Sequence, residues 1–238
     1  MGINLKPNRT PSRMSNQGFT LMELMIALVV SLLALGAIYS TFQSQHKSYQ
    51  VQQETADMHQ NIRAAMYYMT REIRMTGCDP FNTGNFIFAS GTSMANANEI
   101  QFVEDTGDGS GGAPDGTLNN DETIQYKLSN GNLIRNTPIT GDQVVAQHID
   151  ALDFVYLDGA SPPNVLNPGG IPVPAGDLSK IRSVEITIVA RTNDPLLYGT
   201  QNNRKYLNQQ GTQIYAAPGD HVSRRILTSY IKCRNLGL

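Results

Sequence analysis

The hydrophobic and polar positions divide this chain into an apolar run, an amphipathic continuation and a β-patterned remainder. The run 19–39 is 21 residues long and contains one carboxylate, Glu23, and no basic residue. A helix of that length spans about 30 Å, which is the thickness of the hydrocarbon core of a bilayer. We therefore predict an apolar helix over residues 19–42 that spans a membrane or lies in an equally apolar core.

The helical pattern continues beyond the apolar run. No proline occurs between Pro11 and Pro80, and the polar half carries an apolar stripe with helical spacing, made of Ile62, Ala65, Met66, Met69 and Ile73. Thr76-Gly77 supplies a glycine that can end the helix. One helix over residues 19–76 would be about 85 Å long. Its second half, residues 43–77, would pack the stripe on a folded domain.

Residues 78–238 have the composition and the alternation of a β-rich domain. Short strands are expected at residues 98–103, 122–128, 132–135, 151–157, 183–190 and 222–233. Asn130-Gly131 is typical of a type I′ hairpin turn, and five prolines make residues 161–174 a loop. The fold class that follows is α+β, with one long N-terminal helix packed on a mainly antiparallel β-sheet domain.

Charge assigns these regions to different environments. Lys6, Arg9 and Arg13 precede the apolar run without any acid, so the positive-inside rule places residues 1–18 in the cytoplasm and exports everything after the run. The whole chain has 18 basic and 20 acidic residues, a balance that argues against a nucleic-acid-binding protein. Without residues 1–18 the charge is 15 − 20 = −5, so the exported domain is acidic.

Glu23 is the exceptional residue, because a charged group within a bilayer costs roughly 2.5–3.5 kcal/mol. One interpretation is a capping box with Thr20 at the helix start, and a second is an interfacial acid without a role. A third is that Glu23 meets a cationic partner in the membrane, supplied by another chain or by a new N-terminus. A secretory signal peptide cut near residues 34–36 is a rival interpretation of the whole segment, although an acid in its apolar region is unusual.

The residues around Glu23 resemble the prepilin signature of the type IV pilin-like superfamily. The resemblance rests on residues 17–24, Gln-Gly-Phe-Thr-Leu-Met-Glu-Leu, together with the basic leader and the apolar span. It implies that prepilin peptidase, a membrane aspartic peptidase, cuts between Gly18 and Phe19 and then N-methylates Phe19. It also implies that Glu23, at the fifth mature position, pairs in a filament with the terminal amine of a neighbour, which favours the third interpretation.

Further segments look like those of PilW-type minor pilins: Ser48-Tyr49, residues 71–78, Arg224-Arg225-Ile226 and Arg234-Asn235. This resemblance implies a subunit that joins other minor pilins and the major pilin, primes type IV pilus assembly and sits at the tip, with a large tip adhesin as a further candidate partner. It implies a single pass through the inner membrane, a periplasmic domain and later exposure on the pilus. The alternatives are a J-type minor pseudopilin of type II secretion and an independent membrane-anchored binding protein, for instance a calcium-dependent adhesin.

Two cysteines, Cys78 and Cys233, are too few for a disulfide-built scaffold or a four-cysteine zinc site. Export would place them where disulfides persist, so we expect one bridge from the helix end to the last strand. The chain-entropy model gives such a bridge about 5 kcal/mol as an upper figure. The alternative is two small buried thiols that never meet.

An acidic loop offers a candidate metal site. No Lys or Arg occurs between Met75 and Tyr126, and calcium prefers clustered carboxylates on a flexible glycine-rich loop. The candidate ligands are Asp105, Asp108, Asp115 and Asp121, and the alternative is a solvated acidic loop. The four histidines are scattered without metal spacing and no nucleophile has a recognisable base partner, so we expect no enzyme.

Overall fold

A computed structural model describes residues 18–84, 86, 94–107, 113–193 and 201–236. The chain divides into two compact units, Met1–Gln50 and Val51–Leu238. Helix α1 (Leu21–Met75) supplies the described helical part of the first unit and the first element of the second. The predicted helix, residues 19–76, is therefore confirmed to within two residues at each end.

The first unit contains the apolar half of α1. Its 18-residue apolar window has a mean hydropathy of 2.5 and none of it is buried, so this helix is long and apolar enough to cross a membrane. The hydroxyls of Ser31 and Thr41 donate to the carbonyls of Ala27 and Ala37, at 2.7 and 3.0 Å. These bonds satisfy polar groups without water, as an apolar environment requires.

In the second unit, α1 buries the predicted stripe. Met58, Ile62, Ala65, Met66, Met69 and Ile73 are all buried, and they share one core with residues of both larger sheets. Gly77 ends the helix with a φ of +77°, a conformation that L residues rarely adopt. A Cβ there would lie 2.5 Å from Cδ2 of Leu236, so both the turn and the close packing require glycine.

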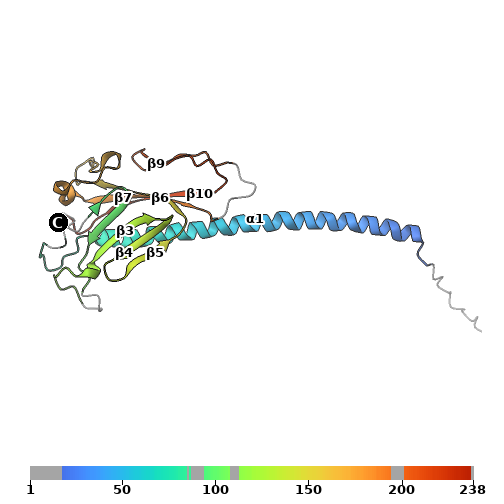
Figure 1. Ribbon diagram of the computed structural model, residues 1–238, viewed down its shortest axis with the longest axis horizontal. Coiled ribbons are helices and arrows are strands. Elements are labelled where there is room, and N and C mark those ends of the chain that lie inside the picture. The colour runs from blue at the N-terminus through green and yellow to red at the C-terminus, as the bar shows by residue number, and fades with distance from the viewer. Residues whose placement is uncertain (1–17, 85, 87–93, 108–112, 194–200, 237–238) are drawn as a thin grey trace, which may run out of the picture. The chain divides into compact units, whose positions relative to one another are not determined.

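Three antiparallel sheets complete the second unit (Figure 1). The first has the order β1-β2-β3-β4-β5, with β1 (Met94–Ala95), β2 (Glu99–Val103), β3 (Thr123–Ser129), β4 (Asn132–Thr137) and β5 (Gly141–Ala146). The second has the order β10-β7-β6, with β6 (Ile149–Leu157), β7 (Ser183–Arg191) and β10 (Arg224–Lys232). The third pairs β8 (Tyr206–Leu207) with β9 (Gln213–Tyr215). Short 3₁₀ turns occupy Asn120–Glu122, Pro168–Gly170 and Ala175–Lys180.

The α+β prediction is confirmed, and so are the six strands expected from alternation, each with small shifts at its ends. The hairpin turn is also present, because Asn130 and Gly131 have φ values of +50° and +72° between β3 and β4. Four further strands, β1, β5, β8 and β9, were not predicted. Three of them have only two or three residues, and β5 has three exposed positions in a row and no alternation.

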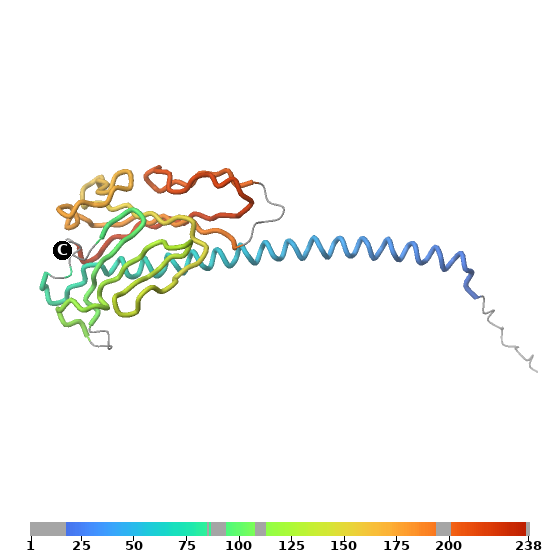
Figure 2. The backbone as a smooth tube through the Cα atoms, viewed as in Figure 1, coloured from blue at the N-terminus to red at the C-terminus, as the bar shows by residue number. Residues whose placement is uncertain are grey.

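The last described residues of the chain lie beside the C-terminal end of α1. The N–H of Arg234 donates to the carbonyl of Arg74 at 3.2 Å, and the side chain of Asn235 donates to the carbonyl of Met75 at 3.1 Å. Figure 2 shows the red C-terminal strand returning to the cyan end of α1. These bonds satisfy carbonyls at the helix end that have no partner within the helix.

Candidate functional site

The N-terminal motif lies at the start of α1. Gly18 and Phe19 precede the first turn, and the Phe19 side chain is 86% exposed. The Oγ1 of Thr20 accepts a hydrogen bond from the N–H of Glu23 at 3.2 Å, so threonine caps the helix. The return bond of a capping box, from the Thr20 N–H to the Glu23 carboxylate, is not found. The capping-box interpretation therefore accounts for Thr20 and not for the carboxylate.

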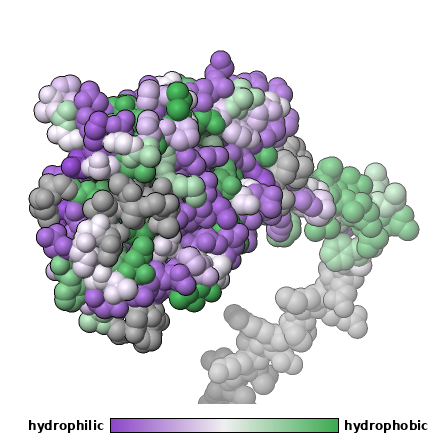
Figure 3. Space-filling model, turned by 60° about the vertical axis from the view of Figure 1, so that its left-hand side comes forward, coloured by the Kyte–Doolittle hydropathy of each residue, from purple (hydrophilic) through white to green (hydrophobic). Residues whose placement is uncertain are grey.

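Within the described part of the chain, the Glu23 carboxylate takes part in no hydrogen bond or ion pair. Apolar side chains surround it on the helix, including Met22, Leu24 and Ile26, which are 73%, 62% and 58% exposed. The space-filling view shows this part of α1 as hydrophobic and the visible face of the second unit as mainly hydrophilic (Figure 3). The motif thus presents an unpaired acid on an uncovered apolar surface.

In the second unit, an ion pair fixes α1 to the first sheet. The Nε of Arg135 on β4 lies 3.0 Å from both carboxylate oxygens of Glu72, and the hydroxyl of Tyr126 on β3 donates to Glu72 at 2.6 Å. Burial is the main cause that raises the pKa of Tyr126, and the neighbouring Glu72 charge raises it further, so the phenol stays a donor. Sequence analysis missed this network, because Glu72 lies beside the apolar stripe with nothing local to mark its partner.

Glu104 lies directly after β2 and is only 7% exposed. Its Oε2 has no hydrogen-bond partner among the described residues. Burial, followed by the charge of Glu72, raises the pKa of Glu104 to about 7, although Arg135 and Arg71 act against this shift. This carboxyl therefore changes charge near neutral pH.

Two of the four candidate calcium ligands, Asp105 and Asp115, accept hydrogen bonds from backbone N–H groups of the loop itself. The carboxylate of Asp105 accepts bonds from the N–H groups of Asp115 and Gly116 at 3.2 and 2.9 Å, and Asp115 accepts one from Thr117 at 2.7 Å. Asp121 has a buried oxygen without a partner in the described part of the chain, and Asp108 lies outside the described residues. No group of three potential ligands occurs among the residues that were described.

The prediction of a disulfide between Cys78 and Cys233 was wrong, because both cysteines are free thiols in the structure. Cys78 leaves the helix at the Gly77 turn, and its carbonyl accepts a bond from Asp105 at 2.9 Å. Burial raises its pKa, as do the nearby charges of Glu104 and Asp105. Cys233 is buried in the core, where burial raises its pKa to about 12. The Cys78 thiol therefore lies near acidic groups at the helix end, whereas the Cys233 thiol lies in the apolar core.

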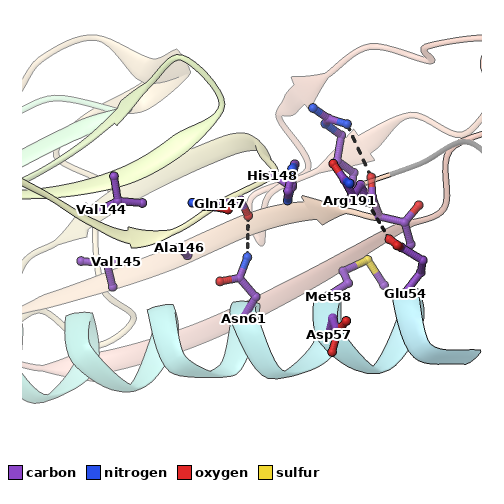
Figure 4. Close-up of a pocket in the computed structure, with 12 residues that line it drawn as sticks. Glu54, Asp57, Met58, Asn61, Val144, Val145, Ala146, Gln147, His148 and Arg191 are labelled. Carbon is purple, nitrogen blue, oxygen red and sulfur yellow. Dashed lines mark hydrogen bonds between the residues drawn. The ribbon is translucent and has the colours of Figure 1, made fainter.

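A polar cavity of about 530 Å³ lies between α1 and the loop that joins β5 to β6 (Figure 4). The side chain of Asn61 donates to the carbonyl of Gln147 at 2.5 Å, and the Glu54 carboxylate accepts the N–H of Asn193 at 3.1 Å. These bonds tie α1 to its neighbours. His148 and Arg191 also line the cavity, but the ion pair of Arg191 goes to Asp150 at 3.1 Å.

Comparison with known proteins finds one family model, described as the prokaryotic N-terminal methylation motif, which matches residues 13–39. Comparison with curated protein sequences finds no match. Among solved structures, the chain is similar to a type IV-like pilin from Thermus thermophilus. The two are 15% identical, with a TM-score of 0.47, and the alignment covers 75% of this chain and 98% of that one.

Proposed function

From the methylation motif at residues 13–39, we propose that this type IV pilin-like chain is processed at Gly18 and assembled into a filament through Glu23. One observation carries the proposal: a carboxylate without a partner in the described chain lies on an exposed apolar helix. The exposed apolar surface is costly in water and the unpaired carboxylate is costly in lipid, and both costs are relieved when helices of several subunits pack together around an ion pair.

Processing would create the missing cation. Cleavage by prepilin peptidase between Gly18 and Phe19 leaves an amine at Phe19, ahead of the first turn of α1. N-methylation keeps that amine protonated and therefore keeps it suitable as an ion-pair partner. The terminal amine of one subunit and Glu23 of its neighbour then neutralise each other in the apolar core.

The finer assignment is a minor pilin that joins other minor pilins and the major pilin, primes assembly and sits at the pilus tip. It is supported by the resemblance of residues 71–78 and 224–226 to PilW-type subunits. In this proposal α1 holds the precursor in the inner membrane, with the N-terminus cytoplasmic and the β-rich unit exported. A J-type pseudopilin would share the same anchor. Deletion of the gene distinguishes them, since a pilus subunit is needed for pili and a pseudopilin for protein secretion.

The mature N-terminus tests the processing step. Mass spectrometry of the protein from its own membrane should find N-methyl-phenylalanine at Phe19. A start near residue 37 would replace the proposal with ordinary secretion.

The variant Glu23→Val tests the assembly step. We expect cleavage at Gly18 to remain intact and co-purification with other pilins to be lost, because the amine of the neighbour loses its counter-charge. Met22→Val is the matched control, since it changes an adjacent exposed side chain and keeps the carboxylate. Normal incorporation of Glu23→Val would overturn the assembly role.

A further inference from the structure

A second groove, of about 640 Å³, runs along the opposite flank of α1 from the cavity in Figure 4. Arg63, Tyr67, Thr70 and Arg74 follow one another at helical spacing along this flank, and Leu227 of β10 forms the facing wall. Tyr67 is 64% exposed and Leu227 is half-buried. The groove therefore has apolar surface among three arginines, Arg63, Arg71 and Arg74.

Strand β10 is the edge strand beside this groove, because its sheet has the order β10-β7-β6. Its pairing with β7 is bracketed by two hydrogen bonds, from Thr192 N–H to the Ser223 carbonyl and from Cys233 N–H to the Arg182 carbonyl. Hydrogen-bonded pairs alternate in an antiparallel ladder, so the odd-numbered residues of β10 bond to β7.

The even-numbered residues of β10 direct their N–H and C=O groups away from β7. For Ile226, Thr228 and Tyr230, no described residue provides a backbone partner for these groups. An unpaired strand edge is a template for a strand from another chain. Thr228 and Tyr230 are both exposed to solvent.

The charges along this edge are positive and uncompensated. Arg63, Arg74 and Arg225 are exposed and form no ion pair with any residue that the structure describes. By contrast, the adjacent Arg224 is held by both Asp150 and Asp220. The three free arginines stand out in a chain with an acidic surplus.

We propose that this edge, β10 with the Arg63–Arg74 flank of α1, binds an extended acidic segment of another exported polypeptide, which adds to the sheet as a strand. Its backbone pairs with Ile226, Thr228 and Tyr230. Its side chains alternate between the two faces of the sheet, so the acidic ones meet the arginines on the α1 side and the apolar ones lie on the opposite face, beside Ile226. A second copy of β10 is a poor occupant, because its own Arg225 would face like charges. The proposal does not rest on filament assembly, since every residue it uses lies in the second unit.

The test uses the full chain in detergent micelles and short fluorescent peptides, with binding measured by anisotropy. An alternating glutamate–valine peptide should bind, and a lysine–valine peptide should bind on the order of tenfold more weakly. The glutamate–valine peptide with N-methyl groups on every amide should lose binding, because neither of its edges can then donate hydrogen bonds to β10. Equal binding of the acidic and basic peptides, undiminished binding of the N-methylated peptide, or no binding at all would overturn the proposal.

Two pairs of variants locate the site. Thr228→Pro removes an outward N–H and should abolish binding, whereas Thr228→Val keeps the N–H and should retain it. Arg74→Glu should weaken the acidic peptide on the order of tenfold, whereas Lys180→Glu, on a 3₁₀ turn that does not line the groove, should not. If Arg74→Glu behaves like Lys180→Glu, the arginine flank is not the binding surface. None of these measurements requires cleavage at Gly18, so their failure is distinct from failure of the assembly role.

Discussion

The clearest quantitative prediction concerns Glu104, the buried carboxyl that follows β2. Burial, followed by the nearby charge of Glu72, raises its pKa from the usual 4.5 to about 7. The folded protein therefore holds this proton more tightly than the unfolded chain does. Glu104→Gln removes the titrating group and keeps the size and shape of the side chain.

The difference between 4.5 and about 7 corresponds to about 3 kcal/mol at 1.36 kcal/mol for each pKa unit. The sign follows from the raised pKa. Below pH 4.5 the carboxyl is protonated in both states and costs nothing. As pH rises from 4.5 to about 7 the unfolded chain releases the proton first, so stability falls, and above about 7 the loss is constant.

Denaturant unfolding of the full chain in detergent tests this prediction, followed by tyrosine signals because the chain has no tryptophan. Glu104→Gln should match the wild type near pH 4.5 and exceed it by up to about 3 kcal/mol near pH 8. Asp57→Asn removes an exposed acid from the same unit and controls for a general change in charge. If the Glu104→Gln and wild-type profiles stay parallel from pH 4.5 to pH 8, burial of a titrating Glu104 is refuted.

Three further predictions concern the second unit. Arg135→Met should destabilise it by about 3 kcal/mol in urea unfolding, because Glu72 is left half-buried without its cation, and Glu72→Met in the same chain should recover most of the loss. Met69→Ala should cost about 2–5 kcal/mol in the same assay, because a side chain with no exposed surface leaves a cavity in the core. Maleimide should label Cys78 in the folded protein, and Cys233 only after unfolding, since Cys233 is fully buried with a pKa near 12; equal labelling by mass spectrometry would contradict its burial.

The helix and the hairpin were predictable because their signals are local. The stripe from Ile62 to Ile73 repeats at helical spacing, and Gly77 is needed at a positive φ whatever the helix packs against. Asn130-Gly131 likewise specifies its turn from two residues. Each of these features depends on neighbours within a few positions, so the sequence contains the whole cause.

The edge strands and the thiols were not predictable in the same way. β5 is stabilised by pairing with β4 and has little alternation, so its residues carry no pattern of their own. Cys78 and Cys233 both lie near the helix end, as the bond between Arg234 and Arg74 shows, yet both remain free thiols. Two backbone segments can lie side by side while the side chains they carry point apart, so the position of two cysteines in the sequence does not determine whether they form a disulfide.

Three glutamates show the difference between a residue that its sequence neighbours make conspicuous and a residue whose properties come from contacts far along the chain. Glu72 and Glu104 gain their properties from residues far along the chain: an arginine on β4 holds the first, and burial behind β2 raises the pKa of the second. Nothing within a few positions marks either residue. Glu23 is conspicuous in the sequence because its neighbours are uniformly apolar, and no described residue pairs with it. A lone charge in lipid costs roughly 2.5–3.5 kcal/mol, and our proposal is that another molecule relieves this cost, through the amine that cleavage would create at Phe19 of a neighbouring subunit.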